Sequence, residues 1–99
     1  STAKFFDSLA INYDKRQVAY QEKVIPFTKK EFDIIELLTR NPGQVFDKER
    51  IYEVILGYDS EGNSSIIVEH MRRIRKKFME YTKKTYIETV WGIGYKWGN

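Results

Sequence analysis

The chain has 99 residues, of which 41 % are hydrophobic and 15 % aromatic, and its formal net charge is +3. This length suits one compact domain with a single core and is too short for two. Residues 1–4 do not have the charged-then-apolar pattern of a signal peptide, and no apolar run approaches the roughly 20 residues of a membrane-spanning helix. The absence of cysteine excludes a disulfide framework and a thiolate zinc site. We therefore expect a cytoplasmic protein with no membrane partner.

The positive charge is concentrated in one stretch. Residues 72–84 contain seven Lys or Arg residues and one acid, a net charge of +6, so the other 86 residues sum to −3. A mildly acidic body with one basic stretch is typical of a nucleic-acid-binding protein. The alternative is a solvated helix face laced with ion pairs, but only Glu69 and Glu80 lie between Glu61 and Glu88 to form them.

The first 27 residues have the pattern of a small antiparallel sheet. Apolar and polar residues alternate in short runs that polar turns separate. Because proline has no amide hydrogen, the run that contains Pro26 should form an edge strand or end there. The runs are residues 5–6, 9–13, 18–20 and 24–27.

The first helix should begin at a capping box, in which Thr28 and Glu31 each bond the other's backbone amide. An apolar stripe follows over residues 32–38, and the Asn-Pro-Gly sequence at 41–43 ends the helix.

A second helix is expected between Asp47, which caps it, and Gly57, which closes it. Its inward-facing residues should be Ile51, Val54 and Ile55.

The third helix should be capped by Ser64 or Ser65 and run to about Tyr81. Four apolar residues at spacings of 4, 3 and 4 share one face and should be core, namely Ile67, Met71, Ile74 and Phe78. The opposite face carries Glu69, Arg72, Arg73 and Lys76.

The last element should be a β-hairpin, with residues 86–91 and 95–97 flanking Gly92-Ile93-Gly94. Both glycines are expected to need unusual dihedrals, and Trp91 and Trp97 are expected in the hairpin core. The order predicts an α+β fold, a winged helix-turn-helix in a single domain over residues 1–99. Its parts are an N-terminal antiparallel sheet at 1–27, a three-helix core at 28–81 and a wing at 86–97.

A helix of about 12 residues or more, apolar on one face and arginine-rich on the other, fits the major groove of B-DNA. The planar fork of arginine can donate twice to guanine O6 and N7. The preceding helix completes a helix-turn-helix, and the hairpin forms a wing that can reach the adjacent minor groove.

Four motifs resemble the effector domain of OmpR/PhoB-type response regulators, over about residues 4–97. They are TKKEF at 28–32, NPGQVF at 41–46, HMRRIRKKF at 70–78 and TVWGIGYK at 89–96. The resemblance implies a four-stranded N-terminal sheet, three helices and a hairpin, and a role in transcription regulation within a two-component phosphorelay. It implies binding to direct-repeat promoter DNA as a homodimer.

The same resemblance implies two kinds of protein partner. RNA polymerase would meet the loop between the second and third helices, at Tyr58, Asp59, Ser60 and Glu61. A sensor kinase would act on an N-terminal receiver domain. Nothing in this chain looks like a receiver, so we expect it outside these residues.

Carried over residue by residue, the resemblance makes Arg73 a base-contacting residue of a recognition helix at about Ser65–Tyr81. It places a phosphate-backbone role on five further residues, which are His70, Arg72, Arg75, Thr89 and Tyr95. Lys76 and Lys77 complete the candidate DNA-binding stretch.

Two candidate residues depart from the family pattern. Trp91 stands where some members insert an arginine into the minor groove, and Lys96 is a weaker substitute beyond the turn. Glu69 stands where a small apolar residue is common. A carboxylate there repels phosphate, but it can accept from cytosine N4 or pair with Arg72 or Arg73.

Enzymatic function is not expected, because no catalytic constellation or phosphate loop stands out. His70 is the only histidine, so we expect no metal and no cofactor. The alternative to sequence-specific DNA binding is a winged-helix module for protein–protein interaction, which would show little salt-dependent affinity for DNA.

Overall fold

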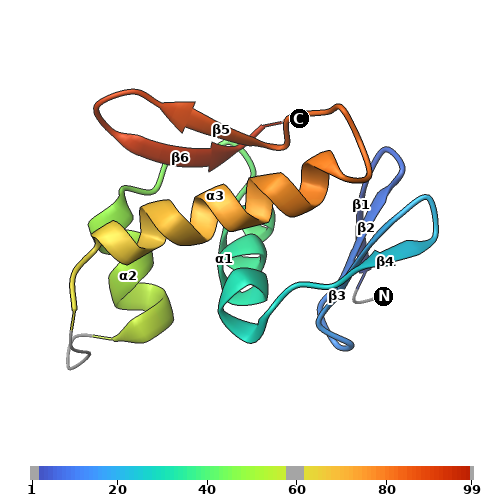
Figure 1. Ribbon diagram of the computed structural model, residues 1–99, viewed down its shortest axis with the longest axis horizontal. Helices are drawn as coiled ribbons and strands as arrows, with labels where there is room; N and C mark the ends of the chain where they lie inside the picture. The colour runs from blue at the N-terminus through green and yellow to red at the C-terminus, as the bar shows by residue number, and fades with distance from the viewer. Residues whose placement is uncertain (1–2, 58–61, 99) are drawn as a thin grey trace.

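The computed structural model describes residues 3–57 and 62–98. Four strands precede three helices and a final strand pair, so the predicted α+β winged helix is confirmed. Figure 1 shows α3 crossing α1, with the hairpin along one side of α3 and the four-stranded sheet beside its C-terminal end. The elements are β1 Ala3–Phe6, β2 Leu9–Asn12, β3 Gln17–Tyr20, β4 Lys23–Ile25, α1 Lys29–Arg40, α2 Lys48–Leu56, α3 Ser65–Met79, β5 Ile87–Val90 and β6 Gly94–Trp97.

The N-terminal sheet is antiparallel throughout, in the order β1-β2-β3-β4. Ile11 is paired with Val18 and Val18 with Ile25, which places these apolar residues on one face. All three are buried in the core. Pro26 follows the edge strand β4, as expected of a residue that cannot donate to a ladder.

The predicted capping box begins α1. The Glu31 amide donates to Thr28 Oγ1 at 3.3 Å, and the Thr28 amide donates to Glu31 Oε1 at 2.9 Å. Lys77 Nζ of α3 donates to the same carboxylate oxygen at 2.5 Å. Burial works to raise the pKa of Glu31, but these hydrogen bonds outweigh it and lower the pKa below its ordinary value.

Asp47 caps α2 as predicted, accepting from the Arg50 amide at 2.7 Å. Ile51 is buried, but the prediction that Val54 faces inward is wrong, because its exposed fraction is 46 %. Tyr52 and Ile55 are the partly buried neighbours. The buried stripe is therefore rotated toward Tyr52, which leaves Val54 at its margin.

The predicted core stripe of α3 is confirmed, since Ile67, Met71, Ile74 and Phe78 are all buried. Within the part of the chain that the structure describes, no helix is long and apolar enough to span a bilayer.

The start of α3 differs from the prediction of a serine cap. Ser64 occupies the cap position, but its hydroxyl donates to Glu49 of α2 at 3.0 Å and makes no capping hydrogen bond. Asn63 Oδ1 accepts instead from the Ser65 amide at 2.9 Å. The asparagine side chain can accept this hydrogen bond because it reaches the amide two residues ahead.

The hairpin is joined to the core by the linker between α1 and α2. Phe46 and Tyr95 exchange backbone hydrogen bonds of 2.8 and 2.9 Å, which adds a bridge beside β6. Gly92 has a positive φ of 78°, whereas Gly94 does not. The prediction of an unusual backbone dihedral is therefore confirmed for Gly92 and wrong for Gly94. Gly94 is needed for space, because a Cβ there would lie 2.2 Å from the carbonyl oxygen of Phe46.

The two tryptophans of the hairpin have opposite environments. Trp97 is fully buried, with its ring centroid 5.3 Å from those of both Tyr86 and Phe6. Trp91 is 89 % exposed, so the prediction that it packs in the hairpin core is wrong. It lies in the turn beyond Val90, the last paired residue of β5, and therefore projects past the ladder.

Candidate nucleic-acid interface

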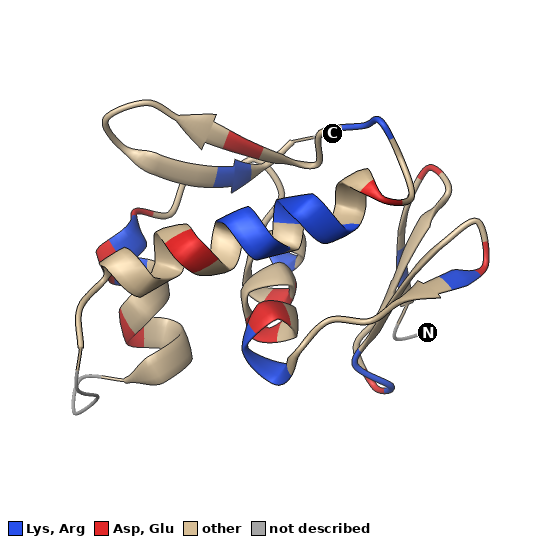
Figure 2. Cartoon of the chain, viewed as in Figure 1, with Lys and Arg blue, Asp and Glu red and all other residues tan. Residues whose placement is uncertain are grey.

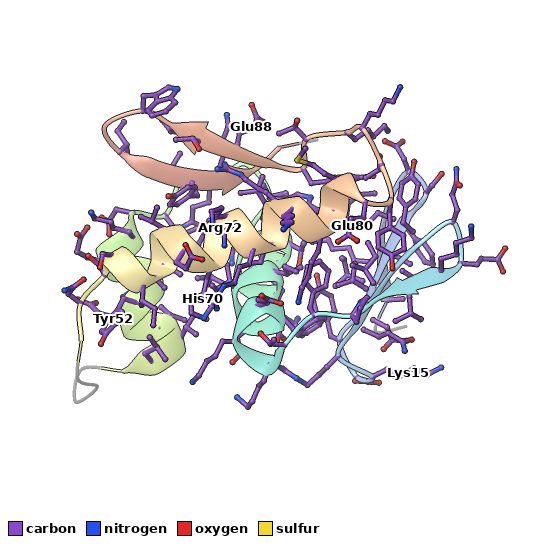
Figure 3. All side chains as sticks on the ribbon, in the orientation of Figure 1. Lys15, Tyr52, His70, Arg72, Glu80 and Glu88 are labelled. Carbon is purple, nitrogen blue, oxygen red and sulfur yellow. The ribbon has the colours of Figure 1, made fainter. Side chains whose placement is uncertain are left out.

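The basic stretch predicted from the sequence forms an exposed face along α3. Figure 2 shows the cationic residues following one another along this helix, with an acidic residue before them and another after them. The side chains of Arg72 and Arg73 are 61 % and 55 % exposed, and Lys76 is also exposed. Figure 3 shows His70, Arg72 and Glu80 projecting from successive parts of the helix.

Glu69 lies within this basic face and contacts both arginines. Arg72 holds the carboxylate side-on, with Nη2 donating to Oε1 at 2.7 Å and Nε to Oε2 at 3.1 Å. Arg73 forms an ion pair with the same carboxylate, its Nε lying 3.3 Å from Oε1. The Arg72 guanidinium lowers the pKa of the Glu69 carboxyl, and the carboxylate raises the pKa of Arg72. The pairing that the sequence left open is therefore present in the free protein.

Arg75 connects α3 to the wing. Its Nη2 donates to the Ile87 carbonyl at 3.1 Å and to Thr89 Oγ1 at 2.7 Å. The guanidinium carbon also lies 5.4 Å from the centroid of the Tyr95 ring. Three residues that the resemblance assigned to the DNA backbone are thus brought together, and one of them holds the other two in place.

Lys77 is placed apart from the exposed face. Its ammonium contacts Glu31 of α1 and lies 5.5 Å from the centroid of the Phe27 ring, and its side chain is 29 % exposed. At 100° per residue, Lys77 falls on the side of α3 opposite Arg75. The structure therefore gives Lys77 a partner inside the protein.

His70 is held by its own helix, with Nδ1 2.8 Å from the carbonyl oxygen of Ile66. Because a carbonyl only accepts, Nδ1 carries the hydrogen, and Nε2 is the nitrogen left to meet an outside group.

The wing presents an apolar tip. Trp91 and Ile93 are 89 % and 62 % exposed, on either side of Gly92. Lys96 lies on β6, paired in register with Glu88. The loop predicted to contact polymerase, Tyr58–Glu61, lies outside the described residues.

A groove of about 460 Å³ lies between α3 and the hairpin, and sequence reasoning missed its apolar lining. Val68 and Met79 contribute to it and are 47 % and 76 % exposed. Both lie about 100° from the buried stripe, on the side of Arg75. Val68 and Met79 become part of a groove because the hairpin docks on that side of α3, and no local sequence pattern encodes this docking. Its full lining is Val68, Glu69, Arg72, Arg75, Lys76, Met79 and Tyr95.

These features define a winged-helix domain in which an exposed basic helix and a tethered hairpin form one surface. Residues 21–97 match the family model described as "Transcriptional regulatory protein, C terminal", and the chain belongs to this family. It is 40 % identical over 86 residues to the transcriptional regulatory protein SpaR of Bacillus subtilis, which covers 87 % of this chain and 39 % of SpaR. The chain thus spans about two fifths of the length of that relative.

Two solved structures are similar over nearly the whole chain. The DNA-binding domain of Klebsiella pneumoniae RstA, in complex with the RstA box, has a TM-score of 0.85 at 25 % identity, covering 99 % of this chain and 98 % of that one. DrrB of Thermotoga maritima, an OmpR/PhoB homologue, has a TM-score of 0.87 at 28 % identity, covering 100 % of this chain and 45 % of that one. The resemblance to the OmpR/PhoB-type effector domain is confirmed.

Proposed function

We propose that this domain binds promoter DNA sequence-specifically as the output domain of a two-component response regulator. The observation that carries the proposal is the exposed basic face of α3, joined to the wing through Arg75. Family membership supports it, as does the likeness to the RstA domain, which was solved in complex with its DNA box.

In this proposal α3 lies in the major groove and each part of the surface has its own role. Arg73 donates to a base edge, because its side chain is exposed and a guanidinium fork matches guanine O6 and N7. Arg72, Lys76 and His70 flank it and contact phosphates, which position the helix without reading sequence.

The wing takes the adjacent minor groove. Thr89 and Tyr95, gathered around Arg75, meet the phosphate backbone between the two grooves. Trp91 at the tip acts as an apolar wedge in place of a charged contact, since minor-groove proteins insert such side chains between base steps. Lys96 adds positive charge behind it.

The assembly follows the family. Two copies bind direct repeats as a homodimer in the cytoplasm, and the segment Tyr58–Glu61 contacts RNA polymerase. A receiver domain in the full-length parent accepts the signal from a sensor kinase.

Selection of binding sites from random duplex DNA, followed by titration of the enriched site at several salt concentrations, tests the proposal. Two direct half-sites about one helical turn apart should emerge. Binding should weaken steeply with salt, because displaced counterions return to the phosphates. If the folded domain enriched no sequence and bound weakly even at low salt, a protein–protein interaction module would be the correct reading.

Two variants test the role of the helix face. Arg73→Ala should cost about 1–3 kcal/mol on the selected site and relax preference at one base pair. Lys83→Ala is the matched control, because it removes one exposed cation from the linker after α3. Equal base-preference profiles for the two variants would refute the role given to Arg73.

A further inference from the structure

Glu69 is an acid at the centre of a surface proposed to face polyanionic DNA. Its carboxylate repels phosphates and so weakens DNA binding. The presence of an acid at this position therefore needs a separate explanation. The two arginines beside it are held differently. Arg72 donates hydrogen bonds through Nε and Nη2, whereas Arg73 forms an ion pair in which Nε lies 3.3 Å from Oε1.

This difference matters for which atoms remain available. Arg72 has one of its terminal nitrogens committed to the carboxylate. Among the residues that the structure describes, neither terminal nitrogen of Arg73 donates a hydrogen bond, and its ion pair with Glu69 is given by the Nε–Oε1 distance. These two nitrogens form the end-on fork that can donate to guanine O6 and N7 together.

A contact at Nε also limits how the guanidinium can turn. A free arginine has many rotamers, and ordering it at a base edge costs conformational entropy. A side chain already paired with a carboxylate has fewer orientations to lose, so the guanine contact forms more readily.

We propose that Glu69 is a positioning residue for base recognition, holding Arg73 so that its terminal fork faces a guanine in the major groove. This inference rests on the proposed function and adds a specificity determinant to it. Direct reading of cytosine by Glu69 is disfavoured, because both carboxylate oxygens already accept from Arg72. The repulsion of phosphate lowers affinity for DNA of any sequence alike, so discrimination between sequences depends on the positioning of Arg73.

Three variants separate positioning from charge. Glu69→Ala removes both the acceptor and the charge, whereas Glu69→Gln removes the charge and keeps an acceptor oxygen for Arg73 Nε. Glu80→Ala is the matched control, because it removes one exposed acid at the C-terminal end of the same helix. The base-preference profile and the salt dependence of binding are measured for each, with a melting curve to confirm folding.

Glu69→Ala should lower the preference for guanine at the position read by Arg73 by about 5- to 10-fold, a part of what a bidentate contact supplies. It should also raise affinity for random DNA by about 2- to 5-fold, through the lost repulsion. Glu69→Gln should raise affinity for random DNA similarly and keep the guanine preference within about 2-fold. Glu80→Ala should leave the profile unchanged.

An unchanged guanine preference in Glu69→Ala would overturn the inference and make Glu69 a source of repulsion only. Loss of a cytosine preference at a neighbouring position, with guanine retained, would overturn it in favour of direct base reading. Failure of the wild-type domain to enrich any sequence would overturn the proposed function itself, an outcome distinct from an enriched site whose profile ignores Glu69.

Discussion

Arg75→Ala should destabilise the fold as well as weaken DNA binding, although Arg75 lies on the same helix as the base-reading candidate Arg73. The substitution removes hydrogen bonds to the Ile87 carbonyl at 3.1 Å and to Thr89 Oγ1 at 2.7 Å. Hydrogen bonds to a charged group contribute about 1.5–3 kcal/mol each. The contact with the Tyr95 ring, at 5.4 Å, adds about 0.5–1 kcal/mol.

Arg75 is only half-buried, so water replaces part of what is lost. We expect a net loss of about 2–3 kcal/mol in the free energy of unfolding. For a domain of this size each kcal/mol shifts Tm by about 4–8 °C, so Tm should fall by about 8–24 °C.

Chemical denaturation followed by the fluorescence of buried Trp97 measures this loss, in a Trp91→Phe background that removes the exposed emitter. Thr89→Val, combined with Arg75→Ala in a double-mutant cycle, should give a coupling of about 1 kcal/mol. Arg73→Ala is the control and should change stability by less than about 0.5 kcal/mol, because its one ion pair is exposed. If the unfolding free energy of Arg75→Ala were also within about 0.5 kcal/mol of the wild-type value, the role of Arg75 in holding the wing would be refuted.

Three further predictions concern other parts of the molecule. Binding to a selected DNA site should change the emission of exposed Trp91, and Trp91→Phe should remove the change, because the remaining tryptophan is buried; a full response from that variant would exclude a wing-tip contact. Gly94→Ala should cost about 3 kcal/mol or more in a denaturation experiment, since its Cβ would lie 2.2 Å from the backbone oxygen of Phe46; a near-native stability would contradict this packing. Glu31→Gln should lose about 2 kcal/mol at pH 7. Because the folded-state pKa of Glu31 is lowered from 4.5, that difference from wild type should shrink in denaturation curves as the pH falls below about 4.5; a difference independent of pH would show that the Glu31 charge contributes nothing.

Elements with a local cause could be predicted from the sequence. The capping box at Thr28 and Glu31 specifies where α1 begins, because both partners lie within one turn. The spacing of the α3 core residues specifies its buried face. Likewise the alternating pattern of the first 27 residues was sufficient to predict short antiparallel strands, although each is only three or four residues long.

Features that depend on how elements dock could not be predicted in this way. The sequence showed a bulky aromatic residue on either side of a turn, but only the ladder length shows that Trp91 projects beyond it and Trp97 does not. Val54 is exposed because the position of the neighbouring helices rotates the buried stripe of α2. Gly94 needs to be glycine because a linker 48 residues earlier in the chain crosses it.

The candidate site, too, could be predicted only in part from the sequence. Its cations could be named from the sequence, because charge and helical spacing are local properties. Their partners could not, because Lys77 contacts a carboxylate on α1 and Arg75 contacts atoms on β5. The structure therefore divides one basic run into an exposed face, a wing tether and an interior ion pair.

The tether has a consequence for how the surface meets DNA. The wing is fixed at its base by buried Trp97 and the Phe46–Tyr95 bridge, and along its side by Arg75. Only the tip around Trp91 extends beyond these attachments. In the proposed binding mode, helix and wing approach DNA with their separation already set, which lowers the ordering cost of contacting two grooves at once. Substitutions at the tip should then affect binding without affecting stability, whereas substitutions at Arg75 should affect both, because its side chain holds the wing and lies within the proposed DNA surface.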